Sequence, residues 1–327
     1  MTAANFCIVL TESLAPAPIA AELLQQLPAY APQLVSYLDQ CQSEKTTITP
    51  RESRCTAFEY WQLQQAGFST AIAKHNAALA LLLASEQQKL NTLAPDQPFW
   101  LVELVHIAPA RDGAALLPAS TLNIQAAQNA ALLASAQALC EGTPFRLSPW
   151  SDTHWQLHYD SSHPLPPTFA SSTLVSRMAV NDWWDQDERS RDWRRFVNEI
   201  QMLYFDHPIN LLRQEQGLAP VNSLWPVGGL PPAAWQPQPI TAKTQVITAL
   251  TESYLRQDWG QWLAELQQID KAIAPLLQDH ALQPQLVLTN TNEYVHASRQ
   301  APRFWQRFVP APFTPTPTWR SHWLAQS

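Results

Sequence analysis

The segment from residue 98 to residue 160 constrains the fold of this chain most strongly. It begins with the apolar, β-rich run "PFWLVELVHIAPA" (98–110), and the turn signal "RDG" (111–113) leads into "AALLPA", which can return as a second strand. A helix is predicted over 120–140 and ends before Gly142, after which "PFRLSPW" and "HWQLHYD" predict a second pair of strands. The order hairpin, helix, hairpin predicts an α+β layer with a small core of its own.

Outside this segment the hydrophobic pattern is mostly helical. "NFCIVL" (5–10) predicts a short buried strand, and the apolar positions of 191–206 recur at helical spacing, which is the strongest helix signal in the chain. Weaker patterns predict an irregular region with short helical pieces over 11–60, helices within 58–92, 242–255, 259–278 and 301–308, a strand over 285–296, and a proline-punctuated loop over 218–241. The predicted fold class is mixed α/β (α+β), helix-rich, with a small mixed sheet.

Charge and hydropathy exclude several classes of partner. The chain has a formal net charge of -7, only 14% charged residues and no basic run, so the sequence predicts no nucleic-acid partner and no binding to anionic membranes. No apolar run approaches the roughly 20 residues that a membrane helix needs. The short apolar run near the N-terminus is preceded by no Lys or Arg, so we expect no signal peptide and a cytoplasmic protein.

Glycine, cysteine and histidine usage bears on cofactors. The chain has 28 prolines and only 7 glycines, with no G-x-G-x-x-G or G-x-x-x-x-G-K-[ST] pattern, so we expect no nucleotide site built on a glycine-rich loop. Its four cysteines lack metal-ligand spacing and are predicted to be free thiols. His106, which ends an apolar strand, is interpreted as a core or edge residue. These observations predict no cofactor.

The segment "NEIQMLYFDHPINLLRQEQGLAPVNSLWPVGG" (198–229) concentrates side chains that could bind a ligand. Pro208 favours the start of a new short helix, so His207 should lie beside its N-terminus, where backbone donors and the helix dipole suit an anion. Asn210 and Arg213 are neighbours on one face of that helix. Because an arginine presents a planar fork to phosphate or carboxylate, this helix could hold an anion.

The turn that follows adds an amide, an indole and a flexible pair of glycines, from Asn222, Trp225 and Gly228. All six residues together could form an anion pocket with an aromatic wall. The same spacing is compatible with a structural corner, in which His207 caps a helix, Arg213 pairs locally and Asn222 satisfies loop backbone groups. The two interpretations differ at Arg213, which a binding role requires to be partly exposed.

The stretch "HPINLLRQEQGLAPVNSLWPVGG" (207–229) resembles the motif H-P-[VI]-N-x-x-R-x-x-x-G-x-x-P-x-N-x-[LI]-W-x-W-G-x-G. That motif belongs to the cofactor-independent, archaeal-type phosphoglycerate mutases and to their bacterial relatives, the RpfE-type regulatory proteins. The resemblance implies a remnant of an alkaline-phosphatase-like architecture. It also implies three parts: an N-terminal strand and helices of the core (1–95), a phosphomutase-like insert with the motif (96–230), and C-terminal helices, strand and tail that complete the core (231–327).

The sequence departs from this family at several positions. Val227 stands in place of the second Trp of the motif, and Leu230 in place of its last Gly. The enzymes of the family bind two divalent ions through an Asp-Gly pair after the first strand, a Ser or Thr nucleophile, and later Asp and His ligands. In this chain the first predicted strand is followed by Thr11 and Glu12 without an Asp-Gly pair, and the later strand carries Asn290 and His296. An amide is a poor substitute for a carboxylate as a ligand of a hard divalent ion.

With those departures, the resemblance implies a phosphoglycerate-mutase-like protein that is catalytically degenerate and has a regulatory or small-anion-binding role. Its ligand would be a small phosphorylated or carboxylated anion. The alternative is an active, metal-dependent phosphoglycerate mutase that uses Mn²⁺ or Mg²⁺. In that enzyme Thr11 would be the nucleophile, and the metal would be held by Glu12, Asn290 and His296.

A third class of function is protein interaction. Two segments rich in Trp or Pro, "NDWWDQ" (181–186) and "PAPFTPTPTWRSHW" (310–323), could dock a protein partner through their aromatic side chains. Packing of the same segments over the core is the other explanation of this pattern.

Overall fold

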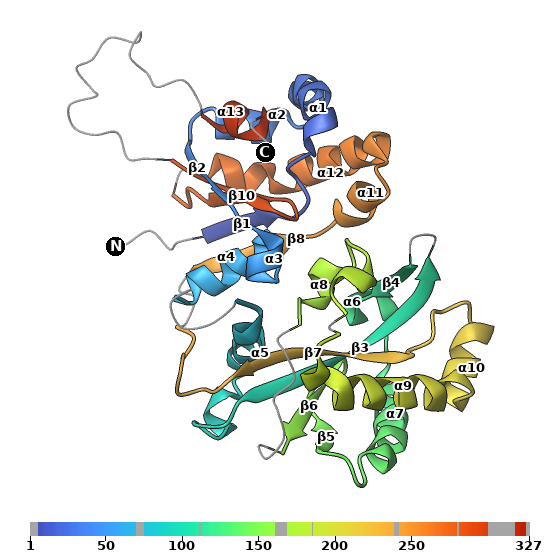
Figure 1. Ribbon diagram of the computed structural model, residues 1–327. Helices are drawn as coiled ribbons and strands as arrows, with labels where there is room; N and C mark the ends of the chain where they lie inside the picture. The colour runs from blue at the N-terminus through green and yellow to red at the C-terminus, as the bar shows by residue number, and fades with distance from the viewer. Residues whose placement is uncertain are drawn as a thin grey trace, which may run out of the picture. The chain divides into compact units, whose positions relative to one another are not determined.

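The chain forms a mixed α/β structure, as the sequence predicts, and its described residues form two sheets. The computed structural model describes residues 6–69, 75–110, 113–160, 169–184, 186–238, 242–279, 281–299 and 318–324. The chain divides into two compact units: unit 1 combines Met1–Thr49 with Pro239–Ser327, and unit 2 is the continuous segment Pro50–Gln238. Each unit has a sheet of its own (Figure 1). The sequence prediction placed residues 50–95 with the N-terminal part of the core, whereas they belong to unit 2.

Unit 1 is built on a five-stranded mixed sheet with the strand order β2-β10-β9-β1-β8. Its strands are β1 (Phe6–Leu10), β2 (Gln42–Thr47), β8 (Lys243–Ile247), β9 (Gln285–Thr289) and β10 (Glu293–Ser298). β1 runs parallel to β8 and β9, and β10 runs antiparallel to β9 and β2. All five residues of β1 are buried, which fits its continuous apolar sequence, because parallel strands are covered on both faces.

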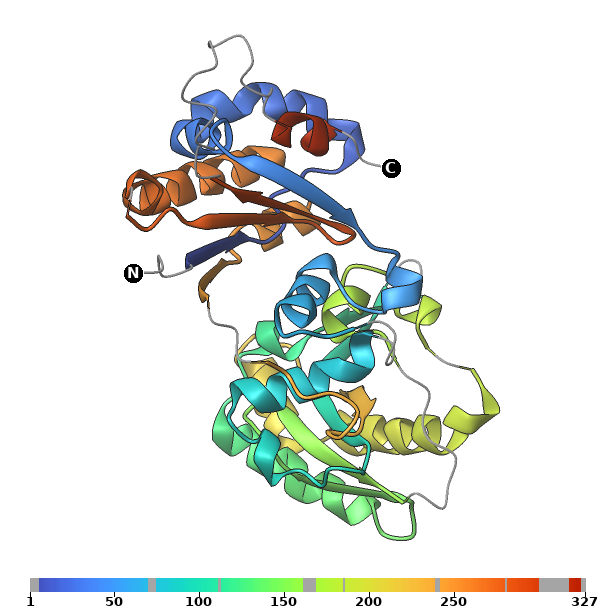
Figure 2. The same cartoon turned by 90° about the vertical axis from the view of Figure 1, so that its left-hand side faces the viewer.

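The helices of unit 1 complete its core. They are α1 (Ala17–Tyr30), α2 (Pro32–Leu38), α11 (Thr251–Leu255), α12 (Trp259–Gln278) and α13 (Trp319–Leu324). α12 contacts α1 and α2, and its buried Asp270 accepts hydrogen bonds from the first backbone N–H groups of α2, at Gln33 and Leu34. α13 lies beside α1, as both views show (Figures 1 and 2). The two ends of the described chain are therefore packed into one unit.

Three sequence predictions in unit 1 are wrong in part. The polar strand β2 lies in the region expected to be irregular, and the region 242–255, expected to be one helix, contains β8 followed by α11. Both strands are at the edges of the sheet, where pairing with a neighbour outweighs weak local propensity. The strand expected over 285–296 is two strands, because Asn290 Oδ1 accepts the N–H groups of Asn292 and Glu293 in a tight turn.

Unit 2 is built on an antiparallel sheet with the order β4-β3-β6-β5, and a further strand, β7, also pairs with β3. Its strands are β3 (Phe99–Ala110), β4 (Gly113–Leu117), β5 (Phe145–Pro149), β6 (His154–Tyr159) and β7 (Ser223–Leu230). The helix α7 (Ala126–Leu139) separates the β3/β4 hairpin from the β5/β6 hairpin, so the predicted hairpin, helix, hairpin order is confirmed. Residues 111 and 112 of the predicted "RDG" turn lie outside the described residues.

The loop predicted over 218–241 contains the strand β7, which the sequence analysis missed. Pro226 is tolerated within it because β7 pairs along one edge only, with β3. Gly228 has a φ of 113°, and a Cβ atom at that position would collide with the carbonyl oxygen of Phe99. The glycine pair therefore permits a close approach of two strands and is not a flexible hinge.

The helices of unit 2 cover its sheet. They are α3 (Pro50–Ser53), α4 (Ala57–Gln65), α5 (His75–Glu86), α6 (Ala119–Leu122), α8 (Ser172–Val175), α9 (Arg191–Phe205) and α10 (Pro208–Glu215), with short 3-10 turns η1 (Leu90–Thr92), η2 (Val180–Asp182) and η3 (Glu188–Ser190). α9 confirms the strongest helix prediction and buries its apolar stripe in the core of unit 2. α5 packs on β7. Across the described residues, no helix has the length and apolar character needed to cross a membrane.

Candidate functional site

Arg213, the centre of the predicted anion site, is fully buried in unit 2. Its Nε donates to the carbonyl oxygen of Ala219 at 2.9 Å, its Nη1 donates to Gln128 Oε1 at 2.7 Å, and its Nη2 donates to the carbonyl oxygen of Leu122. The side chain is 0% exposed, so the prediction that Arg213 is partly exposed is wrong. These hydrogen bonds connect α10 to α6, to α7 and to the loop before β7.

The two predicted amide residues also bind backbone groups. Asn210 is 0% exposed; its Nδ2 donates to the carbonyl oxygens of Tyr204 and Val221, and its Oδ1 accepts the N–H of Val221. The side chain of Asn222 accepts the N–H of Ile107 at Oδ1 (2.8 Å) and donates from Nδ2 to the carbonyl oxygen of Ile107 (2.9 Å). It therefore extends the hydrogen bonding between β7 and β3 by one residue. The alternative interpretation of Asn222, as a residue that satisfies backbone groups, describes this contact.

The other three predicted site residues have structural contacts as well. His207 caps α10 by accepting the N–H of Ile209 at Nδ1, its Nε2 lies 2.9 Å from Ser135 Oγ, and burial lowers the pKa of its imidazole. Trp225 donates its indole N–H to the carbonyl oxygen of Ala170. Together with the close approach at Gly228, these contacts make residues 207–229 a packed corner, and ligand binding there stays a prediction.

Three of the four residues proposed for an active mutase, Thr11, Glu12 and Asn290, lie in unit 1 at the end of the sheet where β1 and β9 finish. Thr11 Oγ1 donates to the carbonyl oxygen of Ile247, and Glu12 is buried, with a φ of 55°. Asn290 Oδ1 is engaged by the backbone of its turn, and the Glu293 carboxylate lies 2.9 Å from Lys45 Nζ. The Lys45 ammonium group occupies the side of the Glu293 carboxylate where a metal ion would bind, and the Asn290 side-chain oxygen already accepts two backbone hydrogen bonds. These contacts do not fit a site for two divalent ions.

His296 is not brought to this group. It lies within β10, and its Nε2 is 3.1 Å from the side-chain oxygen of Gln285, the first residue of β9. Asn290 follows the other end of β9, so the two proposed ligands point to opposite ends of one strand. In the described part of the chain, no group of three or more His, Cys, Asp or Glu side chains could hold a metal ion.

The Trp-rich segments expected to dock a partner are at least partly packed. In α13, Trp319 and Trp323 are 2% and 3% exposed, and residues 310–317 lie outside the described structure. Trp183 and Trp184 are half-buried against the core of unit 2, next to residue 185, which is also outside it. Core packing therefore explains the two C-terminal tryptophans.

A pocket that the sequence analysis did not identify lies in unit 2. It has a volume of about 270 Å³. Its polar wall carries Glu59, Glu86, Glu103, His154, Ser171 and Ser172, and its apolar wall includes Leu79, Leu82, Leu83 and Val227. We call it the Glu103 pocket. Most of these side chains come from β3, β6, α4, α5 and α8, and β3 and β6 are paired with each other.

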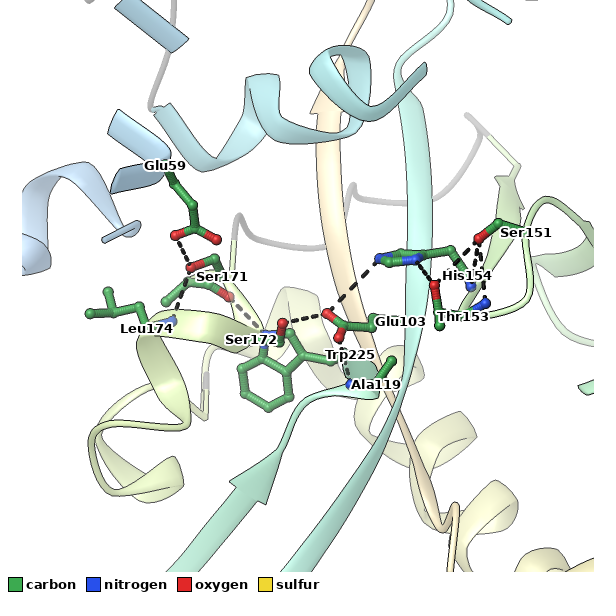
Figure 3. A network of polar contacts seen from close by, with 11 residues as sticks. Glu59, Glu103, Ala119, Ser151, Thr153, His154, Ser171, Ser172, Leu174 and Trp225 are labelled. Atoms are coloured by element: carbon green, nitrogen blue, oxygen red, sulfur yellow. Dashed lines mark hydrogen bonds and ion pairs between the residues drawn. The ribbon is translucent and has the colours of Figure 1, made fainter. Parts of the chain in front are cut away.

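Glu103 organises the polar wall of this pocket. It stands on β3, directly opposite His154 of β6. Its Oε1 accepts the N–H of Ala119 at 2.8 Å, and its Oε2 accepts a hydrogen bond from Ser172 Oγ. The His154 Nε2 atom lies 3.9 Å from the same Oε2 (Figure 3). The carboxylate is therefore held in one orientation from two sides.

A second carboxylate–serine pair lies next to the first (Figure 3). Glu59 Oε2 accepts the hydroxyl of Ser171 at 2.7 Å, and it also accepts the N–H and hydroxyl of Thr56, which forms the capping box of α4. The Oε1 atom of Glu59 takes no part in these bonds. The helix cap thus fixes the orientation of the Glu59 carboxylate.

The electrostatic character of the Glu103 pocket is acidic. Burial lowers the pKa of His154, while the charge of Glu103 acts in the opposite direction. The lowered pKa leaves the imidazole neutral at pH 7. The lining, as far as the structure describes it, contains three glutamates and neither Lys nor Arg. A ligand with a positive charge is therefore favoured over an anion.

The arrangement does not suit nucleophilic catalysis by Ser172. In a catalytic triad the histidine contacts the serine and removes its proton, and the acid orients the histidine. Here the Ser172 hydroxyl is bonded to Glu103, and His154 lies against the same carboxylate. Carboxylates that accept hydrogen bonds from hydroxyl groups have further lone pairs for charge-assisted hydrogen bonds from a bound ligand.

One sequence signal could have indicated this pocket. Glu103 interrupts the apolar run "FWLVELV" of β3, and a carboxylate in the middle of a buried strand requires a partner or a function. His106, three residues further along the same strand, is half-buried. The partners of Glu103 come from distant segments, so spacing could not reveal them.

Comparisons with known proteins found solved structures of low similarity to this chain. No protein-family model and no curated protein matches the chain. A cofactor-independent phosphoglycerate mutase from Thermoplasma acidophilum matches at 13% identity over 89% of both chains, with a TM-score of 0.33. A protein from Pyrococcus horikoshii matches at 11% identity over 93% of this chain and 89% of its own, with a TM-score of 0.43. The solved structures to which this chain is similar thus include a phosphoglycerate mutase, at low identity and low TM-score.

Proposed function

We propose that this chain is a phosphoglycerate-mutase-like protein without mutase activity, with a regulatory role that depends on binding a small amine. The ligand would carry an ammonium group and would bind in the Glu103 pocket of unit 2. The observation that carries the proposal is the excess of fixed carboxylates in this pocket, opposed by no arginine or lysine of its described lining. An excess of carboxylates in a partly buried pocket stabilises a cation and rejects an anion.

Two contacts in unit 1 support the absence of mutase chemistry. Lys45 provides the positive charge next to Glu293 that a divalent ion would otherwise supply. The Asn290 oxygen is committed to its turn. An active mutase that uses Mn²⁺ or Mg²⁺ would need ligands that are free to rearrange around the metal. Small-anion binding at Arg213 receives no support from its burial.

The dimensions of the pocket limit the ligand. A volume of about 270 Å³ is below the usual range for drug-sized ligands, so it suits a molecule with few heavy atoms. The leucines of α5 and Val227 provide an apolar wall for a short hydrocarbon chain. We therefore infer a short aliphatic amine, with its ammonium group between Glu59 and Glu103.

The experiment is a calorimetric titration of the full chain with butylamine and 1,4-diaminobutane. We expect binding of at least one amine, with an affinity that falls at least tenfold in Glu103→Gln. A matched control is Glu199→Gln, which removes an exposed carboxylate of α9 outside the pocket. Glu86→Gln, at the exposed rim, provides a second pocket variant that should fold normally. Equal affinity of Glu103→Gln and wild type, or no binding of either amine, overturns the proposal.

The absence of mutase activity is tested separately. The full chain is incubated with 3-phosphoglycerate and Mn²⁺, and 2-phosphoglycerate is measured. We expect no product. Product formation that EDTA abolishes would overturn this part of the proposal and support the active-mutase alternative.

A further inference from the structure

We propose that a second cavity of unit 2 binds a small organic anion, a carboxylate or a phosphate monoester, through Arg146. This cavity has a volume of about 620 Å³, which is within the usual range for ligand pockets. Its walls include Gln97, Trp100, Arg146, Gln156, His158 and Tyr159. We call it the Arg146 cavity. None of its lining residues belongs to the Glu103 pocket.

Arg146 has a charge that is available to a ligand. It stands on β5, is exposed, and forms no ion pair or side-chain hydrogen bond with any residue that the structure describes. Several other arginines pair with carboxylates, among them Arg195 with Glu199 at 2.9 Å. An unpaired guanidinium at the wall of a cavity presents its planar fork to a carboxylate or phosphate.

His158 is directly opposite Arg146 in the pairing of β5 with β6. Its Nε2 lies 2.9 Å from Ser148 Oγ, on the same hairpin. Burial lowers the pKa of His158, and the charge of Arg146 lowers it further. The positive potential of Arg146 therefore reaches His158, so an anion bound between them should raise the pKa of this histidine.

The remaining walls define the class of ligand. Gln97 and Gln156 provide amide donors, and Leu93, Ala94 and Pro98 add apolar surface. Asp160 is the carboxylate of the described lining, and it limits the negative charge that the cavity accepts. We therefore infer an anion of low charge with a small apolar body.

The experiment uses the full chain with benzoate and phenyl phosphate as probes, and with benzyl alcohol as a neutral probe of the same shape. We expect both anions to bind and benzyl alcohol not to bind. The affinity for the anions should fall at least tenfold in Arg146→Gln and remain unchanged in Arg195→Gln, an exposed arginine on α9. Arg146→Lys keeps the positive charge but loses the planar guanidinium group, so the affinity of this variant for the anions should lie between those of wild type and Arg146→Gln.

A spectroscopic readout separates binding from a general effect on the fold. Histidine NMR titrations with and without phenyl phosphate should show a raised pKa of His158 in the bound state and no change for His322 of unit 1. Equal affinity of wild type and Arg146→Gln, or no binding of either anion at millimolar concentration, overturns the proposal. Glu103→Gln should leave anion binding unchanged, so failure here is distinguishable from failure of the amine proposal.

Discussion

The corner at residues 207–229 and the Glu103 pocket lie in the same unit, and both concentrate polar side chains. In the corner, Arg213 and Asn210 are 0% exposed and direct most of their hydrogen bonds to backbone carbonyls and N–H groups. In the pocket, carboxylates and hydroxyls bind one another and line an open volume. Residue type and spacing in the sequence therefore indicate where polar side chains cluster. Their exposure and their hydrogen-bond partners determine whether they stabilise the fold or are available to a ligand.

The largest expected effect is the loss of stability in Arg213→Ala. The substitution leaves buried carbonyl oxygens of Ala219 and Leu122 without a donor and removes a large packed side chain. We expect the free energy of unfolding, measured by urea denaturation, to fall by about 3–5 kcal/mol. Arg195→Ala, on the exposed face of α9, is the control and should be unchanged. A loss in Arg213→Ala as small as in the control would show that the corner is not a stability element.

The next effect is expected for Asn210→Ala. This change removes three hydrogen bonds and leaves the Val221 N–H group buried without an acceptor. We expect a loss of about 2–3 kcal/mol in the free energy of unfolding. Asn222→Ala, which removes two bonds at a half-buried position, should cost less. If Asn210→Ala weakened amine binding without lowering the free energy of unfolding, the corner would take part in ligand binding, which its burial argues against.

A smaller effect on stability is expected for Glu103→Gln. The amide keeps an oxygen for the Ala119 N–H, and its NH₂ group can donate to Ser172, so the shape of the network is preserved. We expect the free energy of unfolding to change by less than about 1 kcal/mol, while amine affinity falls tenfold, about 1.4 kcal/mol. Thermal denaturation and calorimetry of the same sample measure both quantities. A large loss of stability without a loss of amine affinity would show that Glu103 stabilises the fold, as Arg213 does in the corner, and does not bind the amine.

The smallest effect is a pH dependence shared by both regions. Burial lowers the pKa of His207 in the corner and of His154 in the pocket below the ordinary value of about 6.5. The unfolded state therefore takes up protons near pH 6.5 before the folded state does. The corresponding stability is fully present above that pH and is lost as the pH falls toward the folded-state pKa. Urea denaturation between pH 7.5 and 5 should show this decline, and His154→Gln should reduce it. A decline of the same size in His154→Gln would exclude His154 as a contributor.

The sequence predicted those parts of the fold that depend on local pattern. The period of α9 and the hairpins around α7 follow from residues that are close in the chain. β7 was missed because Pro226 and the glycine pair are typical of a loop, and only the pairing with β3 makes them a strand. The position of Arg213 followed from the motif, but its burial depends on Leu122 and Gln128, which sequence spacing does not place beside it.

The division of unit 1 into two segments has a consequence for the order of folding during synthesis. β1 pairs with β8 and β9, which leave the ribosome only after the whole of unit 2 has been made. Unit 2 is continuous in the chain, so it can complete its core while β1 still lacks both neighbours. Until β8 emerges, the apolar β1 is an unpaired strand that is exposed to aggregation or to chaperones. Truncated chains that end after residue 238 should therefore be rescued by chaperones more than the full chain is.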